Sequence, residues 1–343
     1  FLRSRFLAVQ LGRRSWGGAM GGGSSKSKKK LPPKGAASTS IAPAPVLKAP
    51  SVPSLLALNS ARWEAESRSD PGFGSEEDDN QDVVLVDHLE ELGAFVVGVF
   101  DGHGPSGRQV AQTCRAHLCD AIRKYVPSGE VGEACDWLER CFQSLENRVR
   151  RDLSDRLAES GAAGTVLVYL PARKLLYAAN VGDSKAILID ATTPIESLTV
   201  DHFPSVANER KRIVAAGGRV AASDDVQLGE LGEMRVWKGE DTIPGLTISR
   251  SIGDLIAKEV GVIATPSTQR IDFSEKASGS TKLVVVGSSG IWKVFSPTEL
   301  MNILTRESSV AAAADRAITE ARHRWEELWQ GENMSIVVFV LPG

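Results

Sequence analysis

Residues 97–104, Val-Gly-Val-Phe-Asp-Gly-His-Gly, place a carboxylate and an imidazole directly after an apolar run. Asp101 at the end of a strand can project into a cleft, and Gly102 lets its backbone carbonyl approach a cation. His103 stands where it can donate a proton to a reacting group. The sequence Asp-Gly-His-Gly is also a favourable turn, which is the commoner use of such residues. Taken alone, this segment leaves metal-dependent catalysis and a simple turn both open.

This segment is one of a series of polar motifs along the chain. They are Asn80-Gln81-Asp82 and residues 100–104, 160–161, 180–186, 201–204, 209–213, 217–220, 235–237, 244–254, 287–294 and 332–335. In this order, from about Asn80 to Val340, the chain resembles the type 2C, or PPM-type, metal-dependent protein serine/threonine phosphatases. So many collinear matches are not expected by chance.

The resemblance implies an α+β fold, a two-sheet β-sandwich flanked by helices, with a pair of Mn²⁺ or Mg²⁺ ions between the sheets. In that family the ions activate a water for direct attack on the phosphorus of phosphoserine or phosphothreonine proteins. Two cations suit this task, because they stabilise both the attacking and the leaving oxygen and lower the pKa of bound water.

The resemblance also assigns roles to individual residues. It makes Asp101 and His103 catalytic, with Asp101 bridging the ions and His103 protonating the departing alkoxide. The metal ligands that it implies are Asp82, Asp101, the Gly102 carbonyl, Asp183 and Glu332. Of these, Asp183 helps to hold a more weakly bound further cation.

The chain departs from the family pattern at the metal site. Where the family has Asp-Gly-Leu-Trp-Asp, this chain has Ser289 and Lys293 in place of the two aspartates, and Glu332 replaces the aspartate of Asp-Asn. The phosphate-binding arginine expected about five positions before Asp82 falls on Glu77. Ser289 is a weak ligand for a hard cation, and Glu332 is one methylene longer than aspartate. Since a misplacement of ~1 Å can reduce a rate on the order of 10²-fold, both changes predict a degraded metal position.

Both changes affect the same half of the metal pair, whereas the half made by Asp101, Gly102 and the Gln81-Asp82 pair is intact. Lys293 is expected to be a solvated side chain beside the site. We therefore predict a phosphatase domain whose metal-dependent dephosphorylation is weak or lost. The alternative is an inactive pseudophosphatase that binds phosphoproteins or a partner without turnover, and the sequence names neither substrate nor partner.

Apolar spacing predicts the elements that position these residues. Strands are predicted at 83–86, 95–100, 165–170, 175–179, 186–190, 283–286 and 336–341, and helices at 110–125, 141–157, 206–216, from Ser296-Pro297 and at 311–329. The strands cluster instead of alternating strictly with helices, which disfavours a doubly wound sheet.

Charge divides the chain into a basic tail, residues 1–63, and an acidic domain, residues 64–343. The tail has eleven Lys or Arg and no acidic residue. Of the 40 basic and 43 acidic residues in the chain, the domain therefore contains 29 basic and all 43 acidic ones. An acidic body of this kind does not resemble a nucleic-acid binder and suits a metal site built of carboxylates. The four cysteines show no CxxC spacing, which indicates a reducing compartment, and no apolar run approaches the ~18 residues that span a bilayer.

The tail is predicted to be disordered, because its Gly, Ser, Pro, Ala and Lys content cannot bury enough apolar surface. Met20-Gly21-Gly22-Gly23-Ser24-Ser25 fits the N-myristoylation pattern with Gly21 as acceptor, and four lysines follow within residues 26–30. One acyl chain and a polybasic patch together give peripheral membrane contact for a cytoplasmic protein. Two alternatives remain open here: a solvated linker, and an Arg-rich transit peptide over residues 1–16.

Overall fold

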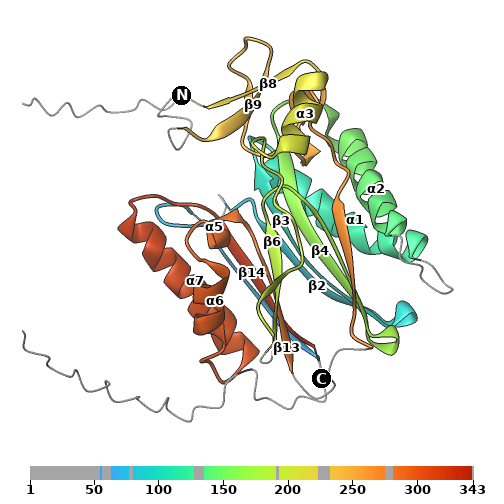
Figure 1. The fold of residues 1–343 in the computed structure, drawn as a ribbon, viewed down its shortest axis with the longest axis vertical. Coiled ribbons are helices and arrows are strands. Elements are labelled where there is room, and N and C mark those ends of the chain that lie inside the picture. The colour runs from blue at the N-terminus through green and yellow to red at the C-terminus, as the bar shows by residue number, and fades with distance from the viewer. Residues whose placement is uncertain are drawn as a thin grey trace, which may run out of the picture. The chain divides into compact units, whose positions relative to one another are not determined.

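The computed structural model describes residues 55, 63–76, 80–126, 135–190, 193–222, 232–274 and 281–341. The predicted lipidation site Gly21, and Glu77 at the expected phosphate-binding position, lie outside these ranges. Within them, two antiparallel sheets pack face to face and helices cover both outer faces (Figure 1). The predicted α+β class with a two-sheet sandwich is confirmed.

The two sheets of the sandwich have the following strand orders. The first sheet runs β12 (Ser267–Asp272), β5 (Leu175–Val181), β4 (Gly161–Leu170), β3 (Ala94–His103) and β2 (Val83–Leu89), with the short β11 (Ile252–Gly253) paired to β4. The second sheet runs β1 (Glu64–Asp70), β14 (Met334–Leu341), β13 (Lys282–Gly287), β6 (Lys185–Asp190) and β7 (Glu196–Ser197).

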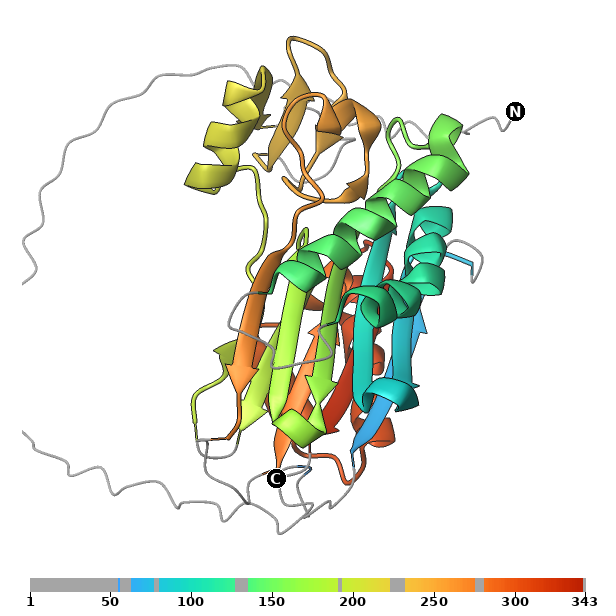
Figure 2. The same cartoon turned by 90° about the vertical axis from the view of Figure 1, so that its right-hand side faces the viewer.

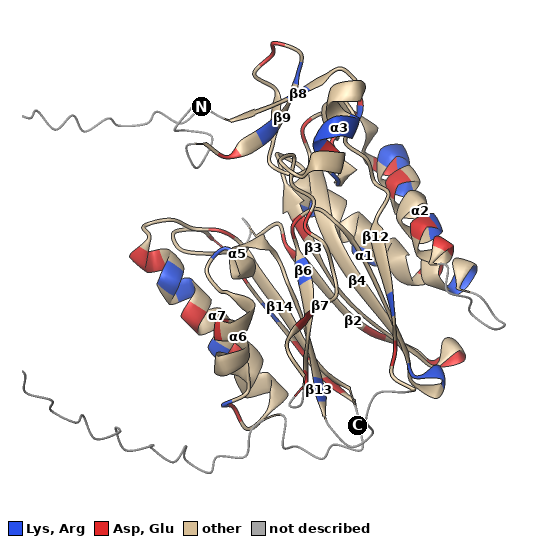
Figure 3. Cartoon of the chain, in the orientation of Figure 1, with Lys and Arg blue, Asp and Glu red and all other residues tan. Residues whose placement is uncertain are grey.

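Each sheet has its own pair of helices on its outer face (Figure 1), and the pair on the first sheet lies in front of it in Figure 2. Helices α1 (Gly107–Tyr125) and α2 (Asp136–Leu153) pack on the first sheet, and α6 (Pro297–Leu304) and α7 (Val310–Glu327) pack on the second. Basic and acidic residues recur along α2 and α7 (Figure 3). No described helix is long and apolar enough to cross a membrane.

The predicted helices are all present, and the largest boundary shifts are in α2, which begins at Asp136 instead of residue 141. The predicted helix at 141–157 ends at Leu153 and continues only as a 3₁₀ turn, Ser154–Arg156. Leu157 is nevertheless fully buried against the same core, so the apolar repeat extends beyond the helix end. Helix α6 begins as its sequence predicts, with a capping box between Ser296 and Glu299.

A small three-stranded sheet, β10 (Pro244–Leu246), β9 (Met234–Lys238) and β8 (Gly218–Ala222), lies at one end of the sandwich with α3 (Ala207–Ala215) and α4 (Leu255–Lys258) (Figure 1). It has a separate apolar cluster. On α3, the buried Glu209 accepts hydrogen bonds at 2.7 Å from Arg212, Arg250 and Ser249. This cluster fixes the small sheet to the chain that leads into β11.

Side-chain alternation brings the site residues to one end of the sandwich. In β3, Val97 and Val99 face the core between the sheets, whereas Val96 and Phe100 face the helices. Because the alternation has a period of two, Asp101 takes the side that faces the other sheet. The same count applies to the other strands, since Val84, Val286 and Val337 all belong to the core between the sheets. Two positions from each of them lie Asp82 before β2, Ser288 after β13 and Ser335 in β14, so these side chains also face inward. The fold thus gathers polar groups between the sheets at one edge.

Candidate active site

Asp101 is held by a serine at the position where a carboxylate ligand was expected. The Ser289 hydroxyl and backbone N–H both donate to Asp101 Oδ2, at 2.7 and 3.0 Å. Ser289 opens the short helix α5 (Ser289–Trp292), so its N–H is free to donate outward. One oxygen of Asp101 therefore accepts two hydrogen bonds from Ser289, where the family motif has a carboxylate.

Asp82 is a buried carboxylate with two serine side chains next to it, those of Ser288 and Ser335. It is 7% exposed, and neither of its oxygens has a partner of normal geometry among the described residues, although Ser288 and Ser335 lie beside it. Burial, and then the neighbouring charge of Asp101, raise the pKa of Asp82 well above its usual value. A buried, unpaired carboxylate is costly unless a proton or a cation compensates it.

The backbone next to Asp101 is shaped so that only glycine fits. A Cβ on Gly102 would lie 2.6 Å from the carbonyl of Gly107 and 2.7 Å from that of Gln81. Asn333 fixes the second of these segments, since its Oδ1 accepts from the Gln81 N–H at 2.8 Å. Asp82, Asp101 and the Gly102 carbonyl offer oxygen donors of the kind that Mg²⁺ and Mn²⁺ prefer. Asp82 and Asp101 lie close enough for the charge of Asp101 to act on Asp82.

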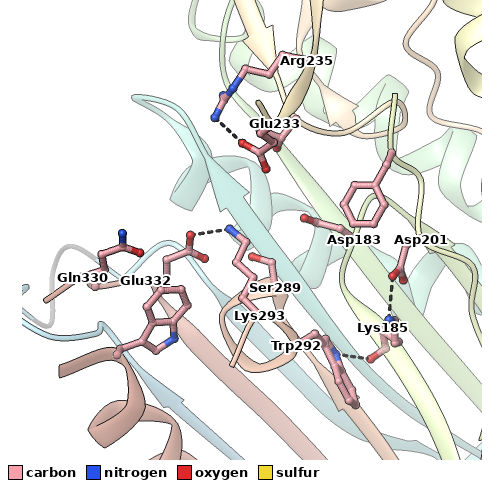
Figure 4. A pocket seen from close by; sticks show the side chains of 14 residues that line it. Asp183, Lys185, Asp201, Glu233, Arg235, Ser289, Trp292, Lys293, Gln330 and Glu332 are labelled. Carbon is pink, nitrogen blue, oxygen red and sulfur yellow. Dashed lines mark hydrogen bonds and ion pairs between the residues drawn. The ribbon is translucent and has the colours of Figure 1, made fainter. Parts of the chain in front are cut away.

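On the other side, Lys293 pairs with the residue expected to be a metal ligand. Lys293 Nζ lies 2.5 Å from Glu332 Oε1, and their side chains are 44% and 33% exposed. Burial lowers the pKa of Lys293, but the charges of Glu332, Asp183 and Asp101 outweigh it and raise the pKa overall. Lys293 is partly solvated, as predicted, but it does not only lie beside the site, because its ammonium pairs with Glu332 (Figure 4).

Most of the sequence-predicted residues line one cleft of about 400 Å³, whereas Asp82 and Gly102 are not part of its lining. Its lining includes Asp101, His103, Asp183, Ser289, Lys293 and Glu332. An adjoining cavity of about 800 Å³ shares four of these residues and extends past the Lys185–Asp201 ion pair (Figure 4). Burial, and then the charge of Asp101, raise the pKa of Asp183 to about 7. Among the described residues, no three His, Cys, Asp or Glu side chains lie close enough together to enclose an ion without adjustment.

A buried acid that sequence analysis did not single out holds His103. Asp254 Oδ2 lies 2.8 Å from His103 Nε2 and also accepts from the Ser251 hydroxyl at 2.5 Å. Burial alone lowers the pKa of His103, but the charge and hydrogen bond of Asp254 raise it overall. A Cβ on Gly161 would lie 2.2 Å from Asp254 Oδ2, so this glycine makes room for the contact. Residue 254 ends the matched 244–254 motif, and only that position pointed to it.

A second histidine supports the loop after β5. The His202 Nδ1 accepts from the Gly182 N–H at 3.2 Å, and its Nε2 lies 2.8 Å from the Ser267 hydroxyl. Because Nδ1 accepts, His202 is neutral in the folded protein. Burial, and then the charge of Arg250, lower the pKa of His202 to about 4.

This depressed pKa predicts acid sensitivity. The unfolded chain binds a proton near pH 6.5 and the folded protein only near pH 4, so His202 stabilises the fold above pH 6.5 and loses that contribution as the pH falls. We expect His202 to reduce the free energy of unfolding by about 2 kcal/mol between pH 7 and pH 5. Urea unfolding at several pH values gives the free energy of unfolding as a function of pH. This free energy should fall more steeply toward low pH in the wild type than in His202→Asn. His323→Asn, at an exposed histidine, serves as control. The same pH dependence of the free energy of unfolding in all three proteins would contradict the prediction.

Comparisons with known proteins agree with this fold and site. The family model described as "Protein phosphatase 2C" matches residues 84–326. The chain is 33% identical over 255 residues to probable protein phosphatase 2C 61 of Arabidopsis thaliana, covering 72% of this chain and 74% of that protein. It is also 33% identical over 261 residues to probable protein phosphatase 2C 64 of Oryza sativa subsp. japonica, covering 72% and 58%.

Solved structures show the same architecture. The serine-threonine phosphatase 2C of Toxoplasma gondii aligns with a TM-score of 0.66 at 17% identity, covering 81% of this chain and 94% of that one. A C. elegans sex determining protein aligns with a TM-score of 0.65 at 21% identity, covering 81% and 64%. Because the family match spans more than half of the sequence and the fold agrees with it, the chain belongs to the protein phosphatase 2C family.

Proposed function

We propose that this chain binds phosphoserine and phosphothreonine in proteins at the cleft around Asp101, and that its hydrolysis of them is weak or lost. The observation that carries the proposal is the pairing of Lys293 with Glu332 at 2.5 Å, next to a Ser289 that donates to Asp101. Half of the expected metal site is thus satisfied by protein groups.

The two halves of the site fit a divalent ion differently. Asp82, Asp101 and the Gly102 carbonyl would hold Mn²⁺ or Mg²⁺, because they offer hard oxygen donors and no described residue makes a hydrogen bond of normal geometry to Asp82. When bound, such an ion supplies a water of lowered pKa for attack on phosphorus. Ser289 and Glu332 do not fit a second ion, since the first is neutral and the second is already paired with an ammonium.

The acid half of the chemistry is retained. Asp254 orients the His103 ring and favours its protonated form, which suits a group that must give a proton to the departing serine or threonine oxygen. His103 is partly exposed and lines the cleft, so a bound phosphoester can reach it. Loss of turnover is therefore attributed to the metal side and not to the proton donor.

Hydrolysis of a phosphothreonine peptide by the purified full chain, with Mn²⁺ or Mg²⁺ in excess, tests this proposal. Asp101→Asn is the blank, because it removes the carboxylate shared by both halves while keeping its shape. We expect turnover that is at most about 10⁻²-fold of that of a phosphatase with both ions, as misplaced ligands predict. Full turnover that disappears in the blank would contradict the proposal.

The ion pair between Lys293 and Glu332 also favours a second candidate, a pseudophosphatase that binds phosphoproteins without turnover. An ammonium that faces the cleft attracts a phosphate group whether or not hydrolysis follows. Binding of the phosphothreonine peptide that exceeds binding of its unphosphorylated form, with no hydrolysis above the Asp101→Asn blank, would identify this function.

A further inference from the structure

We propose that the Lys293 ammonium replaces the second divalent cation, so that the chain binds one Mn²⁺ or Mg²⁺ and faces the phosphoryl group with Lys293 as its other positive charge. The inference rests on the proposed function and deepens it. It concerns what stands in the degraded half of the site, which the proposed function leaves open.

The first support is the exchange of charges at the site. Relative to the family motif, carboxylates are missing at Ser289 and at Lys293, and an ammonium is gained at Lys293. An ammonium is a compact cation with three donors, so it can satisfy the carboxylates that otherwise need a metal ion. The gained cation thus compensates the carboxylates that remain around the position of the lost ligand.

The second support is where the ammonium lies. Nζ of Lys293 contacts Glu332 Oε1 at 2.5 Å, and the charges of Asp183 and Asp101 also stabilise it. A divalent cation bound by Glu332 would stand next to this ammonium, and the two like charges would repel each other within a partly desolvated cleft. One site cannot hold both cations at full occupancy.

The third support is that the backbone under Lys293 is fixed. The Lys293 N–H donates to the Ser289 carbonyl at 2.9 Å, and the Trp292 ring N–H donates to the Gly287 carbonyl at 3.0 Å. On α7, the buried Trp325 donates to the Gly290 carbonyl at 2.9 Å. Helix α5 is thereby anchored at both sides, so Lys293 starts from a defined position.

The remaining donors of Lys293 are available to a substrate. Its side chain is 44% exposed and lines both the 400 Å³ cleft and the adjoining 800 Å³ cavity. Only one contact of the ammonium, with Glu332, is of hydrogen-bond length among the described residues. The ammonium can therefore contact a phosphoryl oxygen while it keeps Glu332.

The test counts Mn²⁺ ions and does not depend on turnover. Equilibrium dialysis and electron paramagnetic resonance are applied to the full-length wild type, to Ser289→Asp/Lys293→Asp, and to Lys238→Met. The last is a matched control, because Lys238 is 43% exposed and pairs with Glu259 at 2.6 Å on the outside of β9. We expect one Mn²⁺ with an uncoupled signal in the wild type and control, and two with an exchange-coupled signal in the double variant.

Binding of inorganic phosphate to the metal-free protein provides a second readout. Lys293→Met should weaken it roughly tenfold, the effect of losing one charge-assisted hydrogen bond, and Lys238→Met should not. Circular dichroism establishes that each variant is folded, and Lys293→Gln replaces any variant that is not. Zero or two Mn²⁺ ions in the wild type, or phosphate binding unchanged by both Lys293 substitutions, overturns the inference. High turnover with one Mn²⁺ refutes only the weak-activity proposal, and weak turnover with two refutes only this inference.

Discussion

Replacing Ser289, Lys293 and Glu332 together by aspartate is expected to raise Mn²⁺-dependent hydrolysis of a phosphothreonine peptide by at least about 10²-fold. The triple variant supplies the missing carboxylate, removes the ammonium that competes for the same oxygens, and shortens the third side chain by one methylene. All three changes act on the same half of the site, and the other half already contains the buried carboxylate of Asp82. Initial rates at saturating Mn²⁺ measure the gain.

A matched variant separates charge from shape in this experiment. Ser289→Asn/Lys293→Asn/Glu332→Asn has nearly the same side-chain volumes as the aspartate variant but no carboxylates. We expect it to remain at the level of the Asp101→Asn blank. If the aspartate variant is folded and binds two Mn²⁺ ions yet gains no activity, the defect lies elsewhere in the chain and the metal-site explanation is wrong.

Asp254→Asn, introduced into the aspartate variant, is expected to reduce its turnover by about 10²- to 10⁴-fold, the usual contribution of a positioned general acid. Asparagine keeps the shape of Asp254 and tolerates its left-handed backbone, where φ is 53°. It removes the charge that raises the pKa of His103. Since the acid must be protonated, activity falls as the pH rises through that pKa, and the basic limb of the rate profile should move to lower pH.

The pH profile distinguishes positioning from a loss of folding. A destabilised protein loses activity at every pH, whereas a lower His103 pKa moves one limb of the curve. Asp272→Asn is the control, because Asp272 is also hydrogen-bonded to a serine but lies on the exposed edge strand β12, with 38% of its side chain accessible. An unmoved basic limb in Asp254→Asn would show that His103 does not need this partner.

Strands and helices with an apolar face could be predicted from the sequence, because burial imposes a period of two or of about 3.6. The strand β1, Glu64–Asp70, could not be, since its sequence Glu-Ala-Glu-Ser-Arg-Ser-Asp has no apolar pattern. It forms because the edge of β14 offers unpaired backbone groups, with Glu64 opposite Val340 and Asp70 opposite Met334. Arg68 then reaches Asp315 on α7. Backbone pairing and ion pairs decide this strand, and neither has a local signature.

The sequence by itself singled out the candidate site groups Asp82, Asp101, Gly102, His103 and Asp183, and the departures at Ser289, Lys293 and Glu332. Only the tertiary structure decided how these groups are used. Lys293 meets Glu332 across 39 positions, and His103 meets Asp254 across 151. Such contacts depend on which strand ends share an edge of the sandwich and on a few ångströms of side-chain reach. Motif spacing contains no information on either point. For that reason Lys293 was predicted to lie beside the site, whereas in the structure its ammonium pairs with Glu332.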